Sequence, residues 1–207
     1  DDLNMTQGAT AISREVYDLH MLIFWICVVI GVLVFGVMFY SMYAYTKKKN
    51  PVAATFHENT KVELAWTIIP FLILIAMAVP ASKTLQSIYN DEAGDINIQV
   101  IGHQWKWQYT YLSDDPTQEV KFISSLLTPP DEYYNRSPKR EHYLSDVDNP
   151  LVIPINKRVR FLITSNDVIH SWWVPDFAVK KDAIPGFVHE AWAVVEEPGI
   201  YRGKCTE

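Results

Sequence analysis

Cysteine is scarce in this sequence: its 207 residues include only Cys27 and Cys205. Two cysteines are too few for the framework of disulfide bridges that stabilises small secreted domains. Internal repeats and low-complexity tracts are also absent, which excludes repeat architectures. A third absence is local, because no charged residue occurs between Met21 and Tyr45 or between Leu64 and Ser82. Segments without charge over such lengths are not typical of a protein surface in contact with water.

The two uncharged runs are long enough to cross a membrane. The first has 25 residues, which at ~1.5 Å per residue exceeds the ~30 Å hydrocarbon thickness of a bilayer. The second has 19 residues and contains Pro70 and Pro80. Prolines are tolerated in lipid where neighbouring helices satisfy the freed carbonyls, so this run predicts a kinked span packed against other protein. We expect spans at about residues 20–45 and 64–83; a buried helix of a soluble core is the alternative, mainly for the second.

Basic residues predict the orientation of this hairpin. The connector carries four lysines, whereas the outer flanks offer only Arg14 and Lys83. Because cytoplasmic loops are enriched in Lys and Arg, the connector is predicted to be cytoplasmic and both termini external. Cys27 would then lie in the bilayer and Cys205 in an external domain, so they cannot pair. The sequence begins with Asp, which fits an exported protein whose signal has been removed.

Charge divides the chain unevenly. Residues 1–90 contain six acids and six bases, whereas residues 91–207 contain 18 acids and 12 bases and so carry the whole net charge of −6. An acidic domain argues against nucleic acid as a partner and favours a basic one. Solubility alone also explains a mildly acidic domain.

Residues 91–207 have the pattern of a β domain. Apolar and polar residues alternate with period two, which is typical of strands with one buried face. Turn signals containing proline, such as Pro129-Pro130 and Pro198-Gly199, separate the segments. Several short strands at this spacing predict an antiparallel sandwich or barrel. The predicted strands lie at residues 96–100, 105–111, 119–123, 151–153, 159–163, 187–195 and 199–201, and residues 131–146 are a predicted surface loop.

Glu63 lies where the basic connector meets the second span. A carboxylate there is ordinarily a solvated residue of the first helical turn, favoured by the helix dipole. Ionisable groups at membrane depth also mark ion routes, so the alternative is the mouth of a proton path. The residues by themselves leave both interpretations open.

His170 and Cys205 are candidate metal ligands. A single histidine on a strand is more often a hydrogen-bonded packing residue than a ligand. Cys205 makes a ligand role for His170 more plausible. A thiol near the end of the sequence has no obvious packing role, and imidazole with thiolate suits copper. Tetrahedral zinc would ordinarily require four ligands, and nothing close in the sequence supplies the other two.

The alternating aromatic residues Trp105, Trp107, Tyr109 and Tyr111 form a core face by default. Four aromatic side chains are more than a small sandwich needs, so Trp105 is a candidate for an exposed position. If it lies among acidic residues, the patch would suit a basic electron-carrying protein. The acids considered are Asp114, Asp115, Glu119, Asp148 and Asp167.

The two-span hairpin and five motifs in order resemble subunit II of the haem-copper cytochrome c oxidases. They occupy residues 62–70, 102–107, 167–172, 182–186 and 198–207. Each is weak alone, but their order along nearly the whole sequence is specific. The resemblance implies a two-helix transmembrane hairpin in residues 1–90, followed in residues 91–207 by an all-β cupredoxin-like Greek-key sandwich or barrel.

The resemblance also implies a function. The chain would accept electrons from cytochrome c at a dinuclear copper centre and pass them to haems of a partner subunit, where O₂ is reduced and protons are pumped. The implied partners are the catalytic subunit I, other oxidase subunits, cytochrome c and membrane lipid. The implied location is the bacterial inner membrane, with both termini and the copper domain on the periplasmic side.

Site residues follow from the same resemblance. His170 would be a terminal copper ligand, and Cys205 one of two bridging thiolates. Glu207 would give its backbone carbonyl to copper and its side chain to a magnesium ion shared with the catalytic subunit. Trp105 would be the residue through which electrons enter, and Glu63 the entrance of a proton channel. The implied cytochrome c docking residues are Asp148, Asp167, Asp114 and Asp115.

The sequence departs from the family pattern after Glu207, where the pattern continues with a second Cys, a His and a Met. We therefore expect that the sequence stops short of the remaining copper ligands. A rival interpretation is a copper-free quinol oxidase subunit II that acts as a structural and docking module. A membrane-tethered copper-delivery protein is a third, but it explains neither Glu63 nor the kinked second span. Copper content discriminates between the first two.

Overall fold

The computed structural model describes residues 3–90 and 92–207. The chain forms two compact units. One contains the described residues up to Tyr17 together with Gln86–Glu207, and the other is Asp18–Leu85.

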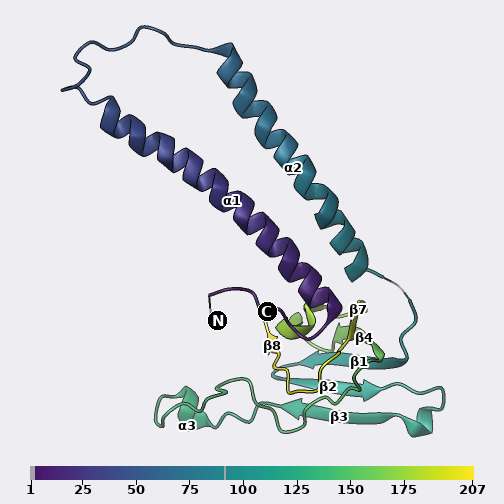
Figure 1. The fold of residues 1–207 in the computed structure, drawn as a ribbon. Helices are drawn as coiled ribbons and strands as arrows, with labels where there is room; N and C mark the ends of the chain where they lie inside the picture. Colours follow the sequence, from purple (N-terminus) through teal and green to yellow (C-terminus); the bar gives the residue numbers. More distant parts are fainter. Residues whose placement is uncertain (1–2, 91) are drawn as a thin grey trace. The chain divides into compact units, whose positions relative to one another are not determined.

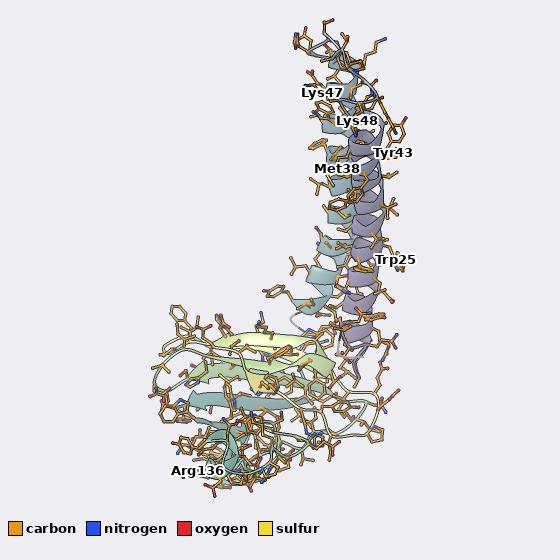
Figure 2. The ribbon with its side chains drawn as sticks, turned by 90° about the vertical axis from the view of Figure 1, so that its left-hand side faces the viewer. Trp25, Met38, Tyr43, Lys47, Lys48 and Arg136 are labelled. Carbon is orange, nitrogen blue, oxygen red and sulfur yellow. The ribbon has the colours of Figure 1, made fainter. Side chains whose placement is uncertain are left out.

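Two long helices, α1 (Ala11–Ala44) and α2 (Thr60–Ile88), precede the β-strands (Figure 1). They contain 34 and 29 residues, more than the ~20 that cross a bilayer. Figure 2 shows Trp25 and Tyr43 projecting away from α1, and both are exposed, as is Met38. In both helices none of the most apolar stretch is buried in the protein, which contradicts the alternative of a soluble core helix. Two helices that are long and apolar enough to cross a membrane are therefore present, as predicted, and each is longer than the predicted span.

Side chains cap both helices at their starts. Thr10 Oγ1 accepts a hydrogen bond from Ser13 N, and Ser13 Oγ accepts one from Thr10 N, each at 3.0 Å. This reciprocal pair satisfies backbone donors that have no partner within the helix. At α2, Asn59 Oδ1 accepts from Val62 N at 3.3 Å.

Two sheets form the β unit. The first has the order β3-β2-β1-β4-β7 and the second the order β6-β5-β8. The strands are β1 (Ile96–His103), β2 (Lys106–Tyr111), β3 (Val120–Ser125), β4 (Arg158–Ser165), β5 (His170–Val174), β6 (Val179–Ala183), β7 (His189–Val194) and β8 (Lys204–Cys205). Three short helical turns lie between them: η1 (Pro116–Gln118), α3 (Pro130–Tyr133) and η2 (Pro175–Phe177).

The predicted antiparallel arrangement is wrong at one pair of strands. β1 and β4 are parallel neighbours, so the larger sheet is mixed. The long segment between β3 and β4 makes this possible, because it carries the chain past β2 and β1 before β4 begins. The predicted strands at 151–153 and 199–201 are not strands either. Around residue 152 the backbone bonds to a side chain instead, since Tyr111 Oη donates to Val152 O at 2.6 Å and accepts from Val152 N at 3.1 Å.

The core lies between the inner faces of the two sheets. Ile98, Val100, Phe161 and Ile163 are fully buried at alternate positions of β1 and β4. The Phe161 ring packs against Trp172 of β5, with ring centroids 4.8 Å apart. This alternation is the reason that two sheets can share one apolar layer. Packing of Trp172 fixes β5, whose first residue is His170.

The segment before α1 belongs to the β unit. Ala9 is buried, its N donates to Asp176 O at 2.7 Å, and its O accepts from Glu196 N at 3.0 Å. Thr10 forms an antiparallel bridge with Val195. The sequence pattern did not predict these contacts.

Candidate metal centre

His170 is held at the start of β5 against β1 of the other sheet. Its side chain is buried, and a Cβ atom on Gly102 would lie only 2.7 Å from His170 Cδ2. A residue with a side chain at position 102 would therefore displace the imidazole. The ring also packs edge-on against Trp107, with centroids 5.8 Å apart.

Asp167 orients the imidazole. Its Oδ1 lies 2.8 Å from His170 Nε2, and its Oδ2 accepts from Gln104 N at 2.7 Å. The hydrogen bond from His170, followed by that from Gln104 N, holds the pKa of the Asp167 carboxyl well below its usual range. An ionised carboxylate favours the tautomer with the proton on Nε2, which leaves the Nδ1 lone pair free to bind a metal.

Cys205 comes to His170 through pairing of the last strand. β8 is antiparallel to β5, with Trp172 opposite Cys205. Cys205 Sγ lies 3.9 Å from His170 Nδ1 and 3.2 Å from Glu207 O. An imidazole nitrogen, a thiol sulfur and a carbonyl oxygen therefore converge, although 35 residues separate His170 from Cys205.

The strand that carries Cys205 is anchored by Tyr201, Arg202 and Gly203, which precede it in the sequence. Tyr201 Oη donates to Glu197 O at 2.7 Å, and its ring packs against Phe177. Arg202 Nε lies 3.3 Å from Asp146 Oδ1. A Cβ atom on Gly203 would lie 2.6 Å from the backbone oxygen of Trp173, so β8 approaches β5 closely at a glycine.

The donors fit part of a copper centre. Nitrogen and sulfur ligands of this kind suit copper. Among residues 3–90 and 92–207, however, no group of three or more His, Cys, Asp and Glu side chains is placed to hold a metal ion. Cys27 lies within α1 and not in the β unit. The described residues thus contribute His170, Cys205 and the carbonyl of Glu207, and a dinuclear centre would need more ligands than these.

Trp105 and two of the four predicted docking carboxylates gather at one end of β2. The Trp105 side chain is 86% exposed between β1 and β2. Asp167 binds the adjacent Gln104 N, and Asp148 Oδ1 accepts from Ser125 N at 2.7 Å, with Ser125 opposite Lys106.

Asp114 and Asp115 lie beyond the other end of β2. Asp115 accepts a hydrogen bond from Thr117 N at the start of η1. A hydrogen bond from the Thr117 side chain, followed by this bond from Thr117 N, lowers the pKa of Asp115. Six residues of strand separate these acids from Trp105, a span of ~20 Å. The structure does not bring them next to Trp105.

Glu63 lies in the first turn of α2, in the helical unit. Its Oε1 accepts from Asn59 N at 3.4 Å, a contact that helps to cap the helix. Glu207 is exposed beside the thiol of Cys205.

Sequence patterns missed two contributions to the site. Gly102 makes room for the imidazole, and the ion pair of Arg202 with Asp146 anchors β8. Asp167 was predicted for docking, whereas its contact with His170 gives it an orienting role as well. Its position three residues before the histidine was the only available signal.

Two family models match the sequence. One is described as "Cytochrome C oxidase subunit II, transmembrane domain" and covers residues 1–84, and the other as "Cytochrome C oxidase subunit II, periplasmic domain" and covers residues 96–207. The chain belongs to the cytochrome c oxidase subunit II family. The predicted fold class, a transmembrane helix pair followed by a cupredoxin-like β domain, is confirmed.

Bacterial subunit 2 proteins are similar in sequence to almost the whole of this chain. A "Probable cytochrome c oxidase subunit 2" of Rickettsia conorii is 39% identical over 96% of this chain and 61% of its own length. "Cytochrome c oxidase subunit 2" of Cereibacter sphaeroides is 32% identical over 97% of this chain and 69% of its own length. The crystal structure of the periplasmic domain of subunit II of cytochrome oxidase of Bradyrhizobium japonicum is 34% identical, with a TM-score of 0.47, over 56% of this chain and 75% of that one.

The chain spans 61% of the length of the Rickettsia conorii relative. Membership of the subunit II family and the two apolar helices identify a membrane protein.

Proposed function

We propose that this subunit II chain transfers electrons from cytochrome c, through a dinuclear copper centre in its β domain, to the haems of the catalytic subunit I. The observation that carries the proposal is the distance of 3.9 Å between His170 Nδ1 and Cys205 Sγ. Two ligands that suit copper converge from different strands. Membership of the cytochrome c oxidase subunit II family supports the same proposal.

His170 would bind through Nδ1, because Asp167 holds the other ring nitrogen. Cys205 would bind as the thiolate, and Glu207 through its backbone carbonyl, with the Glu207 carboxylate available to a magnesium ion shared with subunit I. When bound, the copper pair supplies reversible exchange of single electrons. The pairing of β8 with β5 holds the ligands on rigid elements, which keeps reorganisation small.

Trp105 would receive the electron from the docked cytochrome. An indole that is 86% exposed at the tip of a β-hairpin has little role in packing. Asp148 and Asp167 lie at the same end of β2 and would attract a basic partner. Asp114 and Asp115 lie at the opposite end, so they would contribute mainly to the long-range field.

Glu63 would mark the entrance of a proton channel that serves subunit I, where O₂ is reduced and protons are pumped. Lys47 and Lys48 lie in the connector between the helices (Figure 2). With Lys49 and Lys61 they favour a cytoplasmic connector, which would put Glu63 on the side from which protons are taken up. The β domain and both ends of this sequence would then face the periplasm of a bacterial inner membrane.

Copper content tests the proposal. We expect about two copper atoms per subunit II in the purified oxidase. His170→Ala and Cys205→Ser should lose copper, whereas His142→Ala, in the loop between β3 and β4, should keep it. Elemental analysis of the purified complexes measures this. A complex that assembles without copper in its native form would instead support the quinol oxidase interpretation.

A further inference from the structure

A small pocket lies at the edge of the β unit beside β6 and β7. Its volume is about 40 Å³, and its walls include the apolar side chains of Ile12, Ile88, Phe177 and Val179. Trp192 forms a further wall, and its Nε1 donates to Ile88 O at 3.1 Å. This volume accepts a short apolar segment, not a whole ligand, since a single water needs ~10–15 Å³.

Two lysines of β6 complete the lining. Lys181 is half-buried, with its Nζ 4.3 Å from the centroid of the Tyr89 ring, while Lys180 is exposed. Over the described ranges 3–90 and 92–207, no carboxylate forms an ion pair with either lysine. Arg14 and Arg158 of the same unit are, by contrast, paired with glutamates. The pocket therefore combines apolar walls with cationic groups that have no anionic partner among the described residues.

The walls of the pocket connect it to the membrane. Ile12 and Ile88 belong to α1 and α2, the two membrane-spanning helices. Ile88 follows Ser82, the last residue of the uncharged run, by six residues, which is a rise of ~9 Å along the helix. The polar layer of a bilayer extends ~5–8 Å beyond the hydrocarbon on each side. Along α2, Ile88 therefore lies within about one helical turn of that layer.

We propose that this pocket binds an anionic phospholipid, with the lipid phosphate at Lys180 and Lys181 and an apolar segment of the lipid against Ile12, Ile88 and Trp192. Basic residues near a membrane surface attract anionic lipids. Free phosphate would use the lysines but not the apolar walls, so a lipid matches both features. The site is separate from His170 and Cys205, and the proposal does not depend on copper.

Lipid retention by the intact purified protein tests this. The probes are phosphatidylglycerol and phosphatidylcholine with the same acyl chains, and native mass spectrometry gives the number bound and the apparent Kd. Phosphatidylglycerol should bind more tightly than phosphatidylcholine. Lys180→Gln and Lys181→Gln should each weaken phosphatidylglycerol binding about fivefold. Lys121→Gln should have no effect, because β3 is the opposite edge of the larger sheet from β7.

Three outcomes would overturn the proposal. Equal phosphatidylglycerol affinity in the Lys180, Lys181 and Lys121 variants would show that the pocket lysines do not recognise it. Full displacement by inorganic phosphate at the same concentration would identify a free-anion site. Binding to the separate chain but not to the assembled oxidase would show that a partner subunit covers the pocket. Circular dichroism of each variant checks that the substitutions leave the fold intact.

Discussion

Because of Tyr109, we expect the stability of the β unit to fall as the pH rises through the alkaline range. Its side chain is buried, and Trp172 Nε1 donates to its Oη at 3.2 Å. Burial raises the pKa of Tyr109 to about 12. An unfolded tyrosine ionises near pH ~10, so stability is fully present below that pH. Between the two values the unfolded state releases its proton first, and about 3 kcal/mol of stability should be lost.

The test is denaturant unfolding of the native protein and of Tyr109→Phe from about pH 8 to about pH 12. The variant should be less stable near neutral pH by about 1–3 kcal/mol, because Trp172 loses its acceptor. Its stability should then fall less steeply above pH ~10. Tyr134→Phe, at an exposed position, serves as the control. Curves of equal steepness for all three proteins would refute the role of Tyr109.

Asp167 should control metal affinity without being a ligand. Asp167→Asn removes the negative charge that fixes the His170 tautomer, and loss of such a partner typically costs about 10–100-fold in metal affinity. Competition with a copper chelator measures the change in the purified oxidase. Asp115→Asn, at the far end of β2, should leave affinity unchanged. If the two variants retained copper equally, the contact of Asp167 with His170 would be irrelevant to binding.

Residue types indicated the candidate ligands more readily than the residues around them. His170 and Cys205 are chemically distinctive, because imidazole and thiolate suit copper. The role of Gly102 could not be predicted, because it depends on the close approach of β1 to His170 of β5, which belongs to the other sheet. The pattern of period two gives the face of a strand but not its neighbour.

The segment that precedes α1 packs into the β unit as well as leading into the helix. Gly8 has φ of +69°, and a Cβ atom there would lie 2.5 Å from the backbone oxygen of Asp176. Gly8→Ala should therefore destabilise the protein by about 2 kcal/mol or more, from backbone strain together with the clash.

Gly186→Ala is the matched control for this change. Gly186 also has positive φ, at +82°, but a Cβ atom there would meet nothing within 4 Å. Strain alone should cost about 1–2 kcal/mol. Chemical denaturation of both variants compares the costs. If Gly8→Ala were no more destabilising than Gly186→Ala, the close contact with Asp176 would contribute nothing.

Elements formed by local sequence were predicted well. Both membrane helices follow from composition over consecutive residues, and β1, β2 and β4 from alternation. β6 was missed, because its polar centre, Lys180-Lys181-Asp182, breaks the apolar alternation. β8 was missed because it has only two residues and forms by pairing with β5. Contacts between distant segments fixed these strands.

At the scale of the whole molecule, acidic charge is concentrated in the β domain. Residues 91–207 carry 18 acids and 12 bases, whereas residues 1–90 are neutral. Composition predicted this asymmetry but not which acids gather near Trp105. The structure places Asp148 and Asp167 there and Asp114 and Asp115 at the other end of β2. A docking partner should therefore respond unequally to the four carboxylates.

Turnover of the assembled oxidase with a basic cytochrome c should fall as ionic strength rises. The Debye length shortens from ~10 Å at 0.1 M to ~3 Å at 1 M salt, which screens attraction between the two surfaces. Because Asp148 lies near the exposed indole, Asp148→Asn should raise the KM for the cytochrome and flatten the salt dependence more than Asp115→Asn does. Steady-state kinetics across a salt series measures both effects. Turnover that rose steadily with salt, or identical salt slopes in the two variants, would mean that the cytochrome docks elsewhere.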